Sequence, residues 1–160
     1  MTNEEITMAE ALDKAKVALI REEYDEAIEL LSNVLKEDPR NELAYFTRGA
    51  TYLKKNEQEK AREDFSTYIS LNQSNPKVYF SRGSSYLADG MNSEAMDDFN
   101  RALELNQFYP NAYFGRSEVF SRLGEDEQAA EDRAAGEKIQ KKLSQAYMES
   151  QGVMFQDPAE

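Results

Sequence analysis

The sequence contains no cysteine, no histidine and no tryptophan, and the first two absences exclude most catalytic and metal chemistry. The chain lacks a thiolate nucleophile, the usual zinc ligands and the side chain that exchanges protons near neutral pH. Asp97-Asp98 is an acidic pair, but no third ligand at a suitable spacing accompanies it. We therefore expect no catalytic residue, no metal site and no cofactor, and we predict that the protein is not an enzyme.

Long apolar runs and an excess of basic residues are also missing. No segment approaches the length of about 18 apolar residues that spans a bilayer, and the first residues, MTNEEITMAE, lack the basic and apolar regions of a signal peptide. The net charge of −12 disfavours phosphate backbones and anionic lipid surfaces. We expect a cytoplasmic protein with no nucleic-acid or membrane partner, in which the sequon Asn72-Gln73-Ser74 is unused.

What the chain does contain is an internal repeat. The segment YFTRGATYL at 45–53 returns 34 residues later as YFSRGSSYL, and after another 34 residues as YFGRSEVF. Self-similarity at such a period indicates an array of stacked repeats. With the tyrosine of each copy at position 4, the chain divides into four units at residues 8–41, 42–75, 76–109 and 110–143.

The periodic positions follow a packing logic. Position 20 is alanine in all four units, and position 8 is always small (Ala15, Gly49, Gly83, Ser117). Small residues at these positions let two antiparallel helices approach closely. Phe65 and Phe99 at position 24 are large enough to fill the space between neighbouring units. The first and last units deviate, as expected for repeats that lack a neighbour on one side.

Helix-breaking residues divide the units. Asn75 is a good helix N-cap, and proline suits a first helical turn. Asn56, with Glu59 three residues later, predicts a capping box at the start of a second helix. We expect eight helices in four hairpins, with breaks at Asp38-Pro39, Asn75-Pro76 and Tyr109-Pro110 between units and at Asn56, Gly90 and Gly124 within them.

The pattern resembles the tetratricopeptide repeat family. An aromatic residue at 4, small residues at 8 and 20, tyrosine at 11, an aromatic at 24 and a proline at the junction match well in units two and three. The resemblance implies an all-α, right-handed superhelix of four hairpins with a C-terminal capping helix. We expect one domain over residues 1–150 and a flexible tail at 151–160. Such superhelices usually bind a peptide segment or another protein in a concave groove.

The last helix is expected to continue beyond the repeats. Ile139, Leu143 and Tyr147 recur every four residues and predict an apolar stripe on a helix that runs to about residue 150 and covers the end of the stack. The tail carries an apolar cluster, residues 153–155. An alternative function therefore stays open: self-association into a homodimer through this helix or tail.

In the family, positions 2, 5, 9 and 12 of each first helix line the groove. Three units carry phenylalanine at position 5, and its neighbours are small, including Thr47 and Gly115, which leaves room above the rings. Apolar anchors of a partner would contribute about 1.5–3 kcal/mol each on burial. The alternative, that the rings serve packing alone, stays open. The candidate partner-binding residues are Phe46, Phe80, Phe114, Leu43, Ala50, Lys77, Ser81, Ser84 and Arg122.

Charged residues form two further patterns. Arginine recurs at position 7 (Arg48, Arg82, Arg116) and aspartate at position 23 (Asp64, Asp98, Asp132), which predicts an ion pair between the two helices of a unit. Tetratricopeptide co-chaperones that bind the chaperone tail peptide carry a lysine- and asparagine-rich carboxylate clamp. The corresponding residues here are Leu12, Lys16, Thr47, Lys77 and Ser81, of which only Lys77 matches. The sequence therefore predicts no carboxylate clamp.

Overall fold

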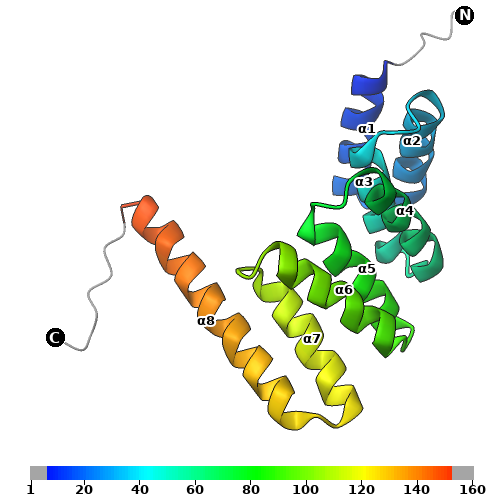
Figure 1. Ribbon diagram of the computed structural model, residues 1–160. Coiled ribbons are helices and arrows are strands. Elements are labelled where there is room, and N and C mark those ends of the chain that lie inside the picture. Colours follow the sequence, from blue (N-terminus) through cyan, green and yellow to red (C-terminus); the bar gives the residue numbers. More distant parts are fainter. Residues whose placement is uncertain (1–6, 153–160) are drawn as a thin grey trace, which may run out of the picture.

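The computed structural model describes residues 7–152, and these form four helical hairpins stacked side by side (Figure 1). The first helices of the hairpins, here called the A helices, are α1 (Met8–Ile20), α3 (Glu42–Lys54), α5 (Pro76–Ala88) and α7 (Pro110–Leu123). The B helices are α2 (Tyr24–Glu37), α4 (Gln58–Leu71), α6 (Asn92–Leu105) and α8 (Asp126–Ser150). The predicted all-α solenoid is confirmed.

Each helix packs mainly on its neighbours in the chain. A and B helices pair within a hairpin, and each B helix packs on the A helix of the next hairpin. The A helices also contact one another, α3 with α5 and α5 with α7. The helices α3, α5 and α7 are therefore adjacent A helices, and they carry the three position 5 phenylalanines.

Some helix ends follow the predicted chemistry. Asn75 caps α5 by accepting a hydrogen bond from the Lys77 amide (3.0 Å), and prolines open α5 and α7. The capping box predicted at Asn56 is wrong. Asn56 has a φ of 61°, and the N-cap of α4 is Glu57, whose side chain makes no capping hydrogen bond. Asparagine tolerates this left-handed conformation, so the residue serves the turn between the helices instead of the helix start.

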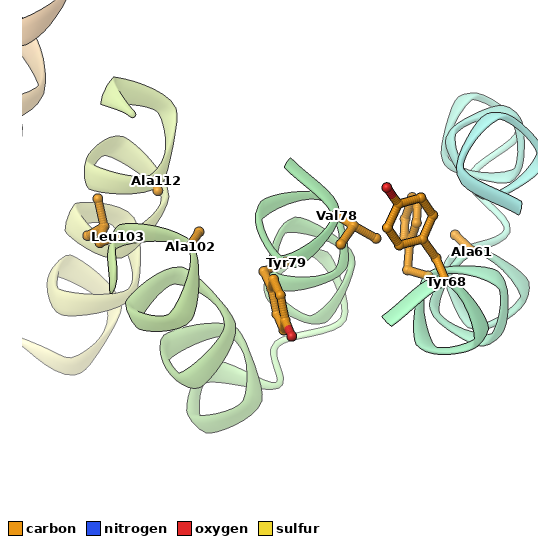
Figure 2. Close-up of a cluster of buried hydrophobic side chains, with 8 residues drawn as sticks. Ala61, Tyr68, Val78, Tyr79, Ala102, Leu103 and Ala112 are labelled. Atoms are coloured by element: carbon orange, nitrogen blue, oxygen red, sulfur yellow. The ribbon is translucent and has the colours of Figure 1, made fainter. Parts of the chain in front are cut away.

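The core runs along the stack between the helices. Figure 2 shows its central cluster, to which α4 contributes Tyr68, α5 Val78, α6 Ala102 and α7 Ala112. Phe65 and Phe99 are fully buried, and a Cβ atom built on Gly49 would lie 2.8 Å from Cε1 of Phe65. The small residues at position 8 therefore do let the phenylalanine of the facing helix approach the backbone, as the repeat pattern predicts.

The last helix, α8, ends the stack and projects beyond it (Figure 1). It packs on α7 through Ala129, Asp132 and Gly136, which are buried, and it continues to Ser150. Every residue from 140 to 152 is exposed. The predicted stripe thus lies on a helix that extends beyond the end of α7. Most of the tail lies outside the described residues.

Candidate partner-binding surface

Three phenylalanines form a row along the A helices. Phe46 on α3, Phe80 on α5 and Phe114 on α7 occupy the same position of successive hairpins, and all three are half-buried. We call them the phenylalanine row. Each ring therefore has one part in the core and one part at the surface. The packing interpretation holds for the buried part, and contact of the exposed part with a partner stays a prediction.

The buried side of the row packs on the B helices. The ring centroid of Phe46 lies 5.9 Å from that of Phe65 in its own hairpin, and the Phe80 centroid likewise lies 5.9 Å from that of Phe99 within the α5–α6 hairpin. Phe80 also meets Tyr109 edge-to-face at 5.4 Å. Phe114 lies over Gly136 of α8, where an added Cβ would come within 2.7 Å of the ring. Aromatic pairs at these distances contribute about 0.5–1.5 kcal/mol beyond area burial, so the row is also structural.

One of the small neighbours of the row has a different role from the one expected. A Cβ on Gly115 would lie 2.6 Å from Cε1 of Phe99 in the preceding hairpin. Gly115 therefore gives Phe99 room to pack against the α7 backbone, and it does not open space for a partner. The expectation of open space failed because position 6 faces the preceding unit, which only the packing of α6 against α7 reveals.

The surface is hollowed between α1 and α3. A cavity of about 320 Å³ is lined there by residues of α1, the following turn, the start of α2 and α3: Leu19, Ile20, Glu22, Tyr24, Thr47, Ala50, Thr51 and Lys54. Thr47 and Ala50, two small neighbours of the phenylalanine row, thus do border open space. Leu43, one turn earlier on α3, is 52% exposed and is available to contact a ligand.

The structure adds Ile20 and Lys54 to the candidates. Ile20 is 83% exposed, which is unusual for a large apolar side chain in a folded domain, and Lys54 is exposed beside it. Both occupy position 13 of their units, where the other two carry Ala88 and Arg122. The sequence feature that could have identified Ile20 is an isoleucine at a position where the other units carry a basic or small residue.

The polar candidate residues differ in whether their side chains already form hydrogen bonds or ion pairs within the protein. Lys77 is exposed and has no ion-pair partner within residues 7–152, whereas the Ser84 hydroxyl donates to the Phe80 carbonyl oxygen at 2.9 Å. Ser81 is half-buried beside the row. Arg122 donates to the Leu87 carbonyl oxygen (2.6 Å) and to Glu118 (3.0 Å), which ties α7 to α5. Of these side chains, Lys77 is the most accessible to a partner.

The recurrent arginines at position 7, the arginine row, form the predicted ion pairs. Arg82 donates two hydrogen bonds to Asp98, both at 2.8 Å, and Arg48 and Arg116 pair likewise with Asp64 and Asp132. The sequence did not reveal a third contact. Each arginine also donates to position 25 of the preceding unit, to Ser32, Ser66 or Asn100. One side chain thereby joins three helices.

The electrostatics of the central pair reflect its burial. The hydrogen bonds to Asp98 raise the pKa of Arg82, which keeps the guanidinium charged. Burial raises the pKa of Asp98 above its ordinary value, although Arg82 opposes that shift. The arrangement stabilises an interhelical contact and has no free proton donor or acceptor, so we assign it a structural role.

The described residues contain neither a metal-binding cluster nor a membrane-spanning helix. Within residues 7–152, no group of three or more acidic side chains is arranged to hold a metal ion. No helix in that range is long and apolar enough to cross a membrane.

The architecture and the A-helix surface define a helical repeat protein, and comparison with protein-family models identifies the repeat. Two models described as tetratricopeptide repeat match residues 18–79 and 76–109. Together they span more than half of the chain, so the chain belongs to the tetratricopeptide repeat family. No curated protein matches the sequence.

Solved structures share the fold. A crystal structure of MamA protein is 26% identical, with a TM-score of 0.79 over 83% of this chain and 73% of that one. MamA from Desulfovibrio magneticus RS-1 is 16% identical, with a TM-score of 0.81 over 87% and 78%. The first tetratricopeptide domain of Spaghetti (RPAP3), bound to the HSP90 peptide SRMEEVD, is 26% identical, with a TM-score of 0.70 over 73% and 93%.

Proposed function

We propose that the protein is a non-catalytic adaptor that binds a segment of a partner protein along its A helices. The observation that carries the proposal is the phenylalanine row, whose half-buried rings lie on three adjacent A helices. A related domain of known structure holds a peptide, which supports this mode of binding. Three apolar anchors at about 1.5–3 kcal/mol each would give an affinity near the micromolar range.

The nature of the surface indicates which partner it suits. The rings and the cavity beside Ile20 favour large apolar side chains, and Lys54 and Lys77 are the exposed cations near them. The partner segment would then present apolar residues spaced to reach successive hairpins. Acidic residues at its ends would complement the two lysines, although exposed ion pairs add only about 0–1 kcal/mol each.

The test has to block the surface without removing core rings. Truncating the phenylalanine row would disturb the packing on Phe65 and Phe99, so we would instead introduce Ala50→Arg and Ser84→Arg, which add bulk over the rings. The matched control is Ser70→Arg with Ser93→Arg, which adds the same charge at exposed positions of the B helices α4 and α6. Helicity and thermal stability of both variants are checked by circular dichroism.

Affinity capture from a lysate of the source cells then compares the three proteins. The proposal expects a partner that the wild type and the control retain and that the Ala50→Arg, Ser84→Arg variant loses. If all three proteins capture the same set, the A-helix surface is not the site.

Self-association is the alternative function, and the exposed stripe on α8 is the observation that favours it. Leu143 and Tyr147 are 51% and 67% exposed. Sedimentation velocity over a hundredfold range of concentration tests this alternative, because a dimer formed through α8 would dissociate on dilution and would be weakened by Tyr147→Ser. A sedimentation coefficient that stays constant and monomeric would exclude it.

A further inference from the structure

The α8 helix forms an open corner with the loop that precedes α7. A cavity of about 310 Å³ lies there, and its apolar lining comes from Phe108 of the loop, Tyr113 of α7 and Ile139 and Leu143 of α8. Phe108 is 62% exposed, and Tyr147 extends the apolar stripe one turn beyond Leu143. We call this set the α8 corner. Phe108, Leu143 and Tyr147 of this set are exposed, and Tyr113 and Ile139 are half-buried.

The charge beside the corner is opposite to that of the whole chain. Lys138 and Lys142 line the cavity, on a chain whose net charge is −12. They lie four residues apart on one helix, where two like charges repel. The residues three and four positions away from either lysine include no acidic residue, and neither lysine forms an ion pair within the described range. The corner therefore suits a ligand that combines apolar side chains with carboxylates.

The segment that follows α8 has this composition. Residues 153–160 read VMFQDPAE, three apolar residues followed by Asp157 and Glu160. The chain enters this segment through Gly152, whose φ of 80° and whose hydrogen bond from its amide to the Glu149 carbonyl oxygen (3.0 Å) form a left-handed helix cap. Such caps turn the chain off the helix axis and commonly bring the next apolar residue back onto the last turn.

The reach of the segment after Gly152 also matches the distances along α8 that it would have to cover. An extended chain advances about 3.3 Å per residue, so Asp157 would reach about 16 Å back from Gly152. The helix rises about 1.5 Å per residue, so Lys142 lies about 15 Å back along α8 from Gly152. On the same scale Phe155 falls between Tyr147 and Leu143. The apolar and acidic residues of the segment would thus meet the apolar and basic residues of the corner in the same order.

We propose that residues 153–160 fold back in cis along α8 and occupy the α8 corner, with Phe155 on the apolar stripe and Asp157 beside Lys142. The tether favours this occupant, because a short flexible connection gives an effective concentration in the millimolar range. The segment would then cover the apolar stripe that would otherwise promote self-association. The inference does not depend on the partner-binding proposal, which concerns the A helices.

Cysteine cross-linking tests the proposal directly, because the chain has no native cysteine. One full-length variant combines Ala146→Cys, which lies between Leu143 and Tyr147 on the stripe, with Gln156→Cys. Its matched control combines Gln145→Cys with Gln156→Cys, since residue 145 lies about 100° away around the helix. The rate of disulfide formation is followed by mass spectrometry under mild oxidation, in dilute protein.

The expected result is an intramolecular disulfide that forms several times faster in the Ala146→Cys variant than in the control. Adding Lys142→Glu should slow the reaction by up to about fivefold, as expected for one exposed ion pair, and combining it with Asp157→Lys should restore the rate. Equal rates in the two cysteine pairs would overturn the proposal, because the tail would then have no preferred face. Disulfide-linked dimers in place of the intramolecular product would also overturn it and would favour a second copy as the occupant.

Discussion

At the scale of single residues, the arginine row carries the most structural information. A guanidinium has five donors in a planar fork, and here it bonds an aspartate of its own hairpin bidentately and a polar side chain of the preceding hairpin. The aspartate partners are buried, at 4% exposure for Asp64 and Asp98. A buried carboxylate is expensive to leave without its counter-charge, so the pair is sensitive to the loss of either member.

Replacing Arg82 by methionine should therefore destabilise the fold. We expect the free energy of unfolding at pH 7 to fall by about 3 kcal/mol, the usual cost of breaking a buried ion pair. Arg101→Met is the matched control, because Arg101 pairs with Glu104 in an exposed position and should cost less than about 1 kcal/mol. Urea denaturation measures the free energy of unfolding of both variants. Equal losses would show that the buried ion pair contributes no more to stability than the exposed one.

The same variant should show a dependence on pH. Burial already raises the pKa of Asp98, and without Arg82 the opposing influence disappears, so the folded-state pKa rises further above the unfolded value. A carboxyl group with a raised folded-state pKa favours folding when it is protonated, and that contribution is lost as the pH rises through the folded pKa. The loss of unfolding free energy in Arg82→Met relative to wild type should thus be smaller at pH 4.5 than at pH 7. A loss of unfolding free energy that is constant between pH 4.5 and pH 7 would contradict the raised pKa assigned to Asp98.

At the scale of the elements, the hairpins depend on close approach of the A and B helices. The position 8 residues allow it, because a Cβ on Gly83 would already lie 3.0 Å from Cε1 of the buried Phe99 and 3.1 Å from Cβ of Asp98. Glycine lowers helix propensity by about 1 kcal/mol relative to alanine. Its use in the middle of α5 is explained by the packing and not by local preference.

Gly83→Val should consequently destabilise the protein strongly. Two methyl groups would be forced against Phe99, and overpacking of this kind costs about 1–3 kcal/mol. Ala88→Val, at an exposed position at the end of the same helix, serves as the control and should change the stability by less than about 0.5 kcal/mol. The midpoint of thermal unfolding by circular dichroism compares them. If the two variants unfold at the same temperature, the facing helix has room that the structure does not show.

At the scale of the whole molecule, the distribution of charge limits the choice of peptide partners. The groove positions that hold a carboxylate clamp in related co-chaperones are Leu12, Lys16, Thr47, Lys77 and Ser81 here. Lys16 pairs with Asp13 at 2.9 Å, which leaves Lys77 as the one exposed cation of this set without an ion pair in the described range. A net charge of −12 adds long-range repulsion for an acidic peptide.

The HSP90 peptide SRMEEVD should therefore not bind this protein. We expect isothermal titration calorimetry to show no saturable heat, with a dissociation constant weaker than about 1 mM, which corresponds to about −4 kcal/mol. The first tetratricopeptide domain of RPAP3, whose structure contains this peptide, is the positive control. A micromolar affinity for the present chain would refute the interpretation of the clamp positions.

The sequence by itself determined the repeat and its internal chemistry. Tyr45, Tyr79 and Tyr113 at a 34-residue interval set the register of three hairpins, and the alanine shared at position 20 extended it to the fourth, because similar units need the same packing residues at the same positions. The pairing of Arg82 with Asp98 followed for the same reason. A local signal could mislead where two local structures use the same residue, as at Asn56, which suits both a helix N-cap and a left-handed turn.

Only the tertiary structure decided how surfaces are used. It showed that the phenylalanine row is half core and half surface, that Gly115 serves Phe99 of the preceding hairpin, and that Arg82 reaches back to Ser66. It also showed that α8 extends beyond α7 and leaves Leu143 and Tyr147 exposed, with Leu143 and Phe108 lining one cavity. These features depend on contacts between units and on where the stack ends. A periodic pattern specifies what each unit contains, and the relative placement of units in space specifies which of its faces remain open.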